Sequence, residues 1–197
     1  METHTPAASR FRLRRSLVLV GLMGAGKTSV GKRLAGLLGV GFTDSDHAIV
    51  EAAGMSIPEI FESLGESVFR DGERRVIARL LAERRGVLAT GGGAFVEPRT
   101  RAEIKANATS VWLRADLDLL WDRVRDRPGR PLLQTANPRE TLAELLERRY
   151  PLYAEADVMV DSRRGASHEA MAQRIIEAVQ AHDRAHGERP PTLEAVA

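Results

Sequence analysis

Eight consecutive residues, Gly21-Leu22-Met23-Gly24-Ala25-Gly26-Lys27-Thr28, have the types and spacing of a phosphate-binding loop. The glycines let the backbone turn tightly around an anion, so that successive N–H groups point at phosphate oxygens. Lys27 can reach the β- and γ-phosphates of a nucleoside triphosphate, and the Thr28 hydroxyl can bind Mg²⁺. A glycine-rich turn with a chance Lys-Thr is the alternative. Because an apolar run precedes the loop and an amphipathic stretch follows it, the pattern predicts nucleoside triphosphate binding.

Two carboxylates, Asp44 and Asp46, end the next apolar run. In an extended chain, side chains at i and i+2 lie on the same side. At the carboxyl end of a strand beside the phosphate loop, these two aspartates could serve Mg²⁺ and a substrate hydroxyl. An Asp-Ser-Asp sequence is also a common helix N-cap or turn, and this second interpretation stays open at this point.

Three consecutive glycines, Gly91, Gly92 and Gly93, directly follow a third apolar run. Without side chains, such a segment lets the backbone approach a ligand closely and donate its N–H groups. A flexible turn is the alternative interpretation.

Arginines cluster in the second half of the chain, around a segment with three prolines and a glycine. Guanidinium groups bind carboxylates and phosphates in bidentate fashion. A single arginine is more often a solvated surface residue, but a mobile loop that carries arginine near a triphosphate can close and stabilise a transferring phosphoryl group. The arginines concerned are Arg70, Arg123, Arg125, Arg127, Arg130, Arg148 and Arg149.

The elements that must position these residues are short apolar runs alternating with helical patterns, which favours a parallel sheet with helices on both faces. The predicted strands are 17–20, 40–43, 87–90, 110–113 and 158–160. The predicted helices are 27–38, 56–63, 67–84, 116–126, 140–149 and 168–181, the second opening with a Ser56–Glu59 capping box. Residues 127–138 are predicted to form a mobile loop.

Composition indicates one domain of a globular protein. The chain has 197 residues, 43% hydrophobic and 28% charged, with a formal net charge of +2, which gives no reason to expect a nucleic-acid partner. It has no cysteine, which excludes disulfides and thiolate metal sites and fits a reducing cytoplasm. No apolar run is long enough to span a bilayer, and no secretory signal is evident. We expect a disordered basic arm at 1–15, a single domain at 16–181 and a disordered polar tail at 182–197.

Taken together and in order, these motifs resemble the shikimate kinase family over about residues 16–180. The motifs that carry the resemblance are the phosphate loop, Asp-x-Asp, Phe69-Arg70, the triple glycine, Arg130-Pro131-Leu132-Leu133 and Arg149-Tyr150-Pro151-Leu152-Tyr153. The family implies a nucleoside-monophosphate-kinase-like fold, with a five-stranded parallel sheet ordered 2-3-1-4-5 and a lid. It implies transfer of the γ-phosphoryl group of ATP to the 3-hydroxyl of shikimate, in aromatic amino acid biosynthesis, with Mg²⁺ and by a cytoplasmic monomer.

The resemblance also implies roles for individual residues. Lys27, Asp46 and Arg130 would be catalytic, with Asp46 as the candidate base and Arg130 on a lid at about 125–137. ATP would be bound by Gly24, Ala25, Gly26, Lys27, Thr28, Ser29, Arg123 and Arg130. Shikimate would be bound by Asp46, Arg70, Gly91, Gly92, Gly93 and Arg149, with its binding segment at about 44–72. Thr28 would bind the metal directly and Asp44 through water.

One departure concerns the family's Arg-x-x-Glu pattern after Phe-Arg, because Asp71-Gly72-Glu73 places a glycine inside the predicted helix. The alternatives are a gluconate kinase-like enzyme and, further off, a nucleoside-monophosphate kinase. A catalytically idle ATP-binding module is the alternative from a different class. Idle relatives usually lose the lysine, an aspartate or the lid arginine, all of which are present here.

Overall fold

A parallel sheet of five strands forms the centre of the molecule. The computed structural model describes residues 11–127, 131–187 and 190–196. The strands are β2 (Ser16–Val20), β3 (Gly41–Asp44), β4 (Gly86–Ala89), β5 (Ala108–Arg114) and β6 (Val158–Asp161). Their spatial order is β3-β4-β2-β5-β6, which is 2-3-1-4-5 when these five are counted along the chain. The predicted fold and strand order are confirmed.

The central strand, β2, is buried along its whole length. It pairs in parallel with β4 and β5, so that Leu17 lies opposite Val87 on one side and Thr109 on the other. A strand covered on both faces reads as a continuous apolar run rather than an alternating one, as Leu17–Val20 does. The carboxyl end of β2 leads directly into the phosphate loop.

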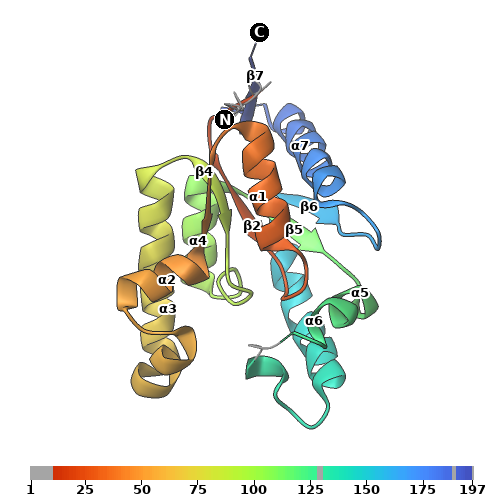
Figure 1. Cartoon of the computed structure of the whole chain (residues 1–197). Coiled ribbons are helices and arrows are strands. Elements are labelled where there is room, and N and C mark those ends of the chain that lie inside the picture. Colours follow the sequence, from red (N-terminus) through yellow and green to blue (C-terminus); the bar gives the residue numbers. More distant parts are fainter. Residues whose placement is uncertain (1–10, 128–130, 188–189, 197) are drawn as a thin grey trace, which may run out of the picture.

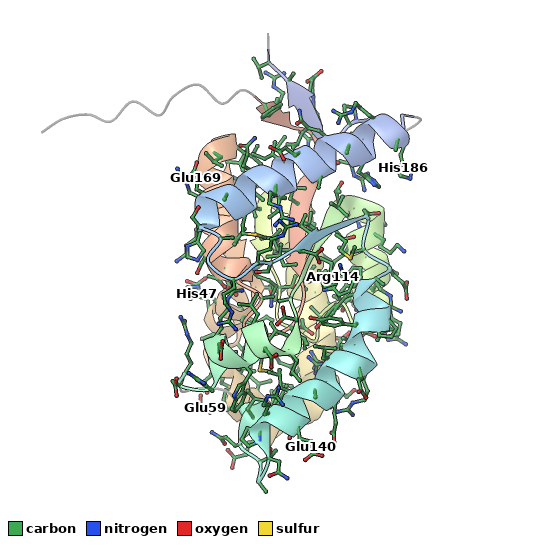
Figure 2. The ribbon with its side chains drawn as sticks, turned by 90° about the vertical axis from the view of Figure 1, so that its right-hand side faces the viewer. His47, Glu59, Arg114, Glu140, Glu169 and His186 are labelled. Atoms are coloured by element: carbon green, nitrogen blue, oxygen red, sulfur yellow. The ribbon has the colours of Figure 1, made fainter. Side chains whose placement is uncertain are left out.

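Helices cover both faces of the sheet because its crossovers run in opposite directions. The connection from β2 to β3 through α1 (Lys27–Leu38) runs toward the β3 edge of the sheet. The connection from β3 to β4 through α3 (Ile57–Glu83) and that from β4 to β5 through α4 (Pro98–Asn107) run in the opposite direction, toward the β6 edge. Right-handed crossovers therefore place α1 on the opposite face from α3 and α4 (Figure 1). The last helix, α7 (His168–Ala185), packs beside α1. In Figure 2 it extends from near Glu169 to His186.

Several helices differ from the prediction. The segments predicted as two helices, 56–63 and 67–84, form the single element α3, which is interrupted at Gly65 by a left-handed φ of 83°. The Ser56–Glu59 capping box is present at its start. Two helices, α2 (Ser45–Ala53) and α4, were not predicted. Weak amphipathic patterns explain the omission, since α4 is mostly polar and its N-terminus opens with Pro98.

The lower right part of the molecule in Figure 1 is built from α5 (Leu117–Val124), the 3₁₀ turn η1 (Pro131–Leu133) and α6 (Pro138–Tyr153). The helix α6 extends four residues beyond the predicted end at 149 and accommodates Pro151 in its last turn. The segment predicted as a mobile loop, 127–138, therefore contains a short helical turn and the first residue of α6. Residues 128–130 lie outside the described part of the chain.

The segments expected to be a disordered arm, 1–15, and a disordered tail, 182–197, contain regular elements in their described parts. Residues 1–10, 188–189 and 197 lie outside the described residues, so the expectation for them stays a prediction. The strands β1 (Phe11–Leu13) and β7 (Leu193–Ala195) pair in antiparallel fashion to form a terminal ribbon at the top of Figure 1. The helix α7 also continues past 181 to Ala185. Each strand has only three residues, so neither shows a periodic pattern, and the pairing partner lies about 180 positions away.

Candidate active site

The phosphate loop, residues 21–28, joins β2 to α1 and has the conformation that its glycines predict. Gly24 has a φ of +82°, and a β-carbon there would lie 2.8 Å from Val124 Cγ1, so both backbone and space require glycine. The Lys27 ammonium group donates to the carbonyl oxygens of Gly21 and Leu22 at 2.8 and 2.9 Å. The lysine is thereby folded back over the loop, next to the amino end of α1.

A cavity of about 310 Å³ opens over this loop. Seven of the predicted ATP-binding residues line it together: Gly24, Ala25, Gly26, Lys27, Thr28, Ser29 and Arg123. Asp44, Asp46, Gly91 and Gly92 line it as well. Arg127, which the sequence analysis named among the clustered arginines without assigning it a role, also lines the cavity, as do Ala166, His168 and Met171, which were not predicted. Because the last three come from the segment after β6, only the folded structure brings them to the phosphate loop.

Asp44 combines the two roles that the sequence left open. It caps the N-terminus of α2, because one carboxylate oxygen accepts the backbone N–H of Asp46 at 3.1 Å. Its other oxygen accepts a hydrogen bond from the Thr28 hydroxyl at 2.9 Å. A hydroxyl and a carboxylate oxygen side by side at the end of a phosphate loop are the hard donors that Mg²⁺ prefers. Among the described residues, no group of three His, Cys, Asp or Glu side chains could hold a metal by itself.

Asp46 lies in the first turn of α2 and not in an extended strand, which corrects the geometric part of the prediction. It still lines the same cavity as Asp44. Its carboxylate packs against Gly91, where an added β-carbon would lie 2.5 Å from Asp46 Oδ1. A side chain at Gly91 would therefore displace this carboxylate.

The triple glycine, residues 91–93 (the glycine loop), is the surface on which three predicted side chains meet. Asp46 contacts Gly91, and a β-carbon at Gly92 would lie 3.4 Å from Arg149 Nη1. At Gly93 it would lie 2.5 Å from Arg70 Nη1. The three glycines thus contact three different side chains, a relation that the sequence did not reveal.

Arg70 is held by two carboxylates on its own helix, α3. Its guanidinium group donates to Glu73 at 2.8 Å and to Glu66 at 3.2 Å, and it lies over the Phe69 ring at 5.1 Å. Glu73 is only 1% exposed, and burial raises its pKa, while the ion pair with Arg70 opposes that rise. Desolvation tends to lower the pKa of Arg70, but its two carboxylate partners outweigh burial and raise it.

Glu73 is a site residue that the sequence analysis missed. Arg70-Asp71-Gly72-Glu73 has the spacing of the family's Arg-x-x-Glu pattern. The departure noted in the sequence therefore concerns only the glycine within the pattern and not the position of the glutamate. Residues three apart face each other on a helix, and this spacing was the available signal.

Arg149 comes from α6, which runs from near Glu140 up toward the sheet in Figure 2. Its Nη1 donates to the Gly92 carbonyl at 3.2 Å. Tyr153, one helical turn later, donates its hydroxyl to the same carbonyl. Burial raises the pKa of Tyr153 to about 12. Both donors therefore fix α6 to the glycine loop.

Arg123, near the end of α5, contacts the other side of the phosphate loop. Its Nη1 donates to the Gly24 carbonyl at 3.1 Å and to the Ser162 hydroxyl at 3.0 Å. Burial lowers the pKa of Arg123, and the nearby Arg164 adds to this effect. The predicted lid residue Arg130 lies outside the described residues, so its position relative to this cavity stays a prediction.

The fold and the site together define a P-loop phosphotransferase, with a phosphate loop, an aspartate beside it and two arginines against the neighbouring glycine loop. A family model described as shikimate kinase matches residues 23–180. The shikimate kinase of Paramagnetospirillum magneticum is 59% identical over 151 residues, which cover 77% of each chain. That of Ruegeria pomeroyi is 56% identical over 167 residues, covering 85% of this chain and 86% of the relative.

Among solved structures, a shikimate kinase from Acinetobacter baumannii in complex with shikimate superposes with a TM-score of 0.80 at 42% identity. The match covers 85% of this chain and 93% of that one. The chain belongs to the shikimate kinase family. The enzyme class that the motifs predicted is confirmed.

Proposed function

We propose that this chain transfers the γ-phosphoryl group of ATP to the 3-hydroxyl of shikimate, giving shikimate 3-phosphate and ADP. Membership of the family supports this assignment, and one observation in the structure carries it. The glycine loop gathers Asp46, Arg70 and Arg149 on one surface beside the phosphate loop. Phosphoryl transfer asks mainly for positioning and charge neutralisation, and this arrangement offers both.

ATP is proposed to lie in the cavity over the phosphate loop. The backbone N–H groups at the amino end of α1 and the Lys27 ammonium group would bind the β- and γ-phosphates. Gly24, Ala25, Gly26, Thr28 and Ser29 line the phosphate end of this cavity. Arg123 would lie beside the nucleoside, because it adjoins the loop on the side lined by Ala166 and His168.

Shikimate is a carboxylate with several hydroxyl groups, so its site needs cations at one end and an acceptor at the other. Arg70 and Arg149 would hold the carboxylate by charge-assisted hydrogen bonds. The backbone of Gly91, Gly92 and Gly93 would face the ring, since glycines have no side chains of their own to keep it away. Glu73 would keep the Arg70 guanidinium in one orientation through its buried ion pair.

Asp46 is proposed to orient the 3-hydroxyl toward the γ-phosphate and to accept its proton. Its carboxylate lines the cavity within the same wall as Lys27 and is backed by Gly91. The hydroxyl oxygen forms the new P–O bond, the bond to the β-phosphate oxygen breaks, and the proton goes to an Asp46 oxygen late in the transfer. Arg130, on the lid, is proposed to stabilise the charge on the transferring group.

Mg²⁺ fits the pair formed by the Thr28 hydroxyl and the Asp44 carboxylate, which lie 2.9 Å apart. Thr28 would bind the ion directly and Asp44 through a water molecule, in keeping with the few protein ligands that Mg²⁺ usually takes. When bound, the ion neutralises charge on the β- and γ-phosphates.

The cellular setting is also a proposal. The absence of cysteine from the 197 residues supports a reducing compartment, the cytoplasm. No helix in the described ranges is long and apolar enough to cross a membrane. A monomeric state follows the habit of the family.

The test is a coupled assay of ADP release with Mg·ATP and either shikimate, gluconate or no acid. We expect release that depends on shikimate. Arg70→Ala should raise the KM for shikimate by about 10- to 100-fold, because hydrogen bonds to charged groups contribute about 1.5–3 kcal/mol. Arg75→Ala is the matched control, since Arg75 lies on the same helix and is 70% exposed.

The other outcomes separate the alternatives. Release that depends on gluconate would keep the chemistry and overturn the substrate. Tight ATP binding without release for either acid would indicate an idle ATP-binding module. An equal loss in both arginine variants would remove Arg70 from the carboxylate site.

A further inference from the structure

The carbonyl group of Gly92 is the point at which α6 and the glycine loop are joined. It accepts hydrogen bonds from Arg149 Nη1 at 3.2 Å and from the Tyr153 hydroxyl. A carbonyl oxygen has two lone pairs, so these donors fill its capacity. The donors are four residues apart on α6 and therefore lie on one face of the helix.

Tyr153 is fixed more firmly than Arg149. Its side chain is fully buried, and its ring packs beside the Trp112–Tyr150 pair, with centroid separations of 6.1 and 6.3 Å from these two rings. Burial raises the pKa of its hydroxyl to about 12. The hydroxyl therefore stays protonated near neutral pH and acts as a fixed donor, not as an acid or a base.

Arg149 is the more adaptable partner. Its guanidinium group has five N–H donors, and the bond to Gly92 engages Nη1. The remaining donors can serve an anion as long as the bond to Gly92 holds the guanidinium group in its present position beside the glycine loop. With the tyrosine hydroxyl absent, the Gly92 carbonyl would depend on Arg149 alone, and the charged donor would close on it.

We propose that Tyr153 is a positioning residue for substrate binding, which holds the Gly92 carbonyl so that Arg149 can present its free N–H groups to the substrate carboxylate. This inference rests on the proposed role of Arg149 in the function above. Tyr153 itself does not line the cavity over the phosphate loop. It acts through one backbone carbonyl and one guanidinium group.

The experiment compares Tyr153→Phe with Tyr150→Phe. Tyr150 is the matched control because it lies on the same helix and in the same aromatic cluster, but its hydroxyl donates to the Ala115 carbonyl instead. Each substitution removes one hydrogen-bonded hydroxyl and keeps the ring. For both we would measure kcat, the KM for shikimate, the KM for ATP and the melting temperature.

We expect Tyr153→Phe to raise the KM for shikimate by about tenfold, the equivalent of one hydrogen bond, and to leave the KM for ATP unchanged. Tyr150→Phe should change neither KM by more than about twofold. Both variants should melt at similar temperatures. A purely structural role for Tyr153 would lower the melting temperature and leave the KM for shikimate at its wild-type value, and that result would overturn the proposal.

A double-mutant cycle tests the route through Arg149. Arg149→Lys and Tyr153→Phe should be non-additive in the KM for shikimate, because each disturbs the same contact. Full additivity, or an Arg149→Lys variant with a wild-type KM, would refute the coupling. A wild-type chain that phosphorylates no shikimate would instead overturn the proposed function, and with it this inference.

Discussion

The carboxylate of Asp46 rests directly on the backbone of Gly91, with no room for a β-carbon between them. A methyl group at Gly91 would lie 2.5 Å from Asp46 Oδ1. The backbone of Gly91 is not in the left-handed region, so alanine is conformationally acceptable there. A substitution at Gly91 should therefore move the Asp46 carboxylate without straining the backbone of the loop.

Gly91→Ala should lower kcat by about 100-fold, because displacing a reacting group by about 1 Å has an effect of that order. The free energy of unfolding should change little. Gly36→Ala is the control, since a β-carbon at Gly36 meets no other atom within 4 Å and lies on α1 away from the cavity. Steady-state kinetics and urea unfolding of both variants check this. Wild-type kcat in Gly91→Ala would contradict the proposed role of Asp46.

Asp46→Asn should reduce kcat by about 10²- to 10⁴-fold, the usual contribution of a positioned general base. Binding of ATP should stay near the wild-type level, because the contacts to the phosphates are proposed to come from the phosphate loop and Lys27 and not from Asp46. The measurements are single-turnover phosphoryl transfer and calorimetric titration with ATP. Near-normal turnover would remove Asp46 from the role of base.

The buried Glu73 predicts a pH dependence of stability. Burial raises the pKa of this carboxyl group in the folded protein above its ordinary value of 4.5. The raised pKa means that protonated Glu73 contributes stability to the folded protein below pH 4.5. This contribution is lost as the pH rises through the pKa that Glu73 has in the folded protein. Wild type should therefore lose stability relative to Glu73→Gln as the pH rises from about 4.5 toward neutrality.

Urea unfolding of both proteins at several pH values measures this difference. Glu66→Gln is the control, because it removes the exposed carboxylate on the same guanidinium group. A difference that grows in favour of wild type with rising pH would mean that the ion pair with Arg70 outweighs burial.

Leu193, in the terminal ribbon, is buried against the core together with Leu13. Leu193→Ala should lower the free energy of unfolding by about 2–4 kcal/mol, as large-to-small changes in a core do. It should leave kcat and both KM values unchanged, because the ribbon lies at the amino ends of the strands and the site at their carboxyl ends. Val196→Ala, at a residue 56% exposed, is the control for stability. A change in kcat would indicate coupling between the ribbon and the site.

The sequence predicted those parts of the site that are contiguous along the chain. Residues 21–28 determine their own loop, because the glycines, Lys27 and Thr28 act on one ligand through local backbone geometry. Asp44 could be predicted for the same reason, since an N-cap and a strand end are both local features. The helix that places Asp46 was missed because Ser45 and Asp46 continue directly from the strand without a turn.

Relations between distant residues could not be predicted in this way. The contacts of the glycine loop with Asp46, Arg149 and Arg70 span 45, 57 and 23 positions of the chain, and no local pattern encodes them. The same holds for Tyr153, whose partner is a backbone carbonyl that has no sequence signature. Glu73 had a signal in its spacing from Arg70, and only the burial of its side chain shows its importance.

The terminal ribbon also has a consequence for circular permutation of the chain. Because Phe11 pairs with Ala195, the two ends of the fold leave from one pole, opposite the catalytic edge of the sheet. A short linker between them should close the polypeptide into a ring without crossing the nucleotide cavity. Circular permutants with new ends in surface turns, and fusions at either natural end, should therefore retain catalysis.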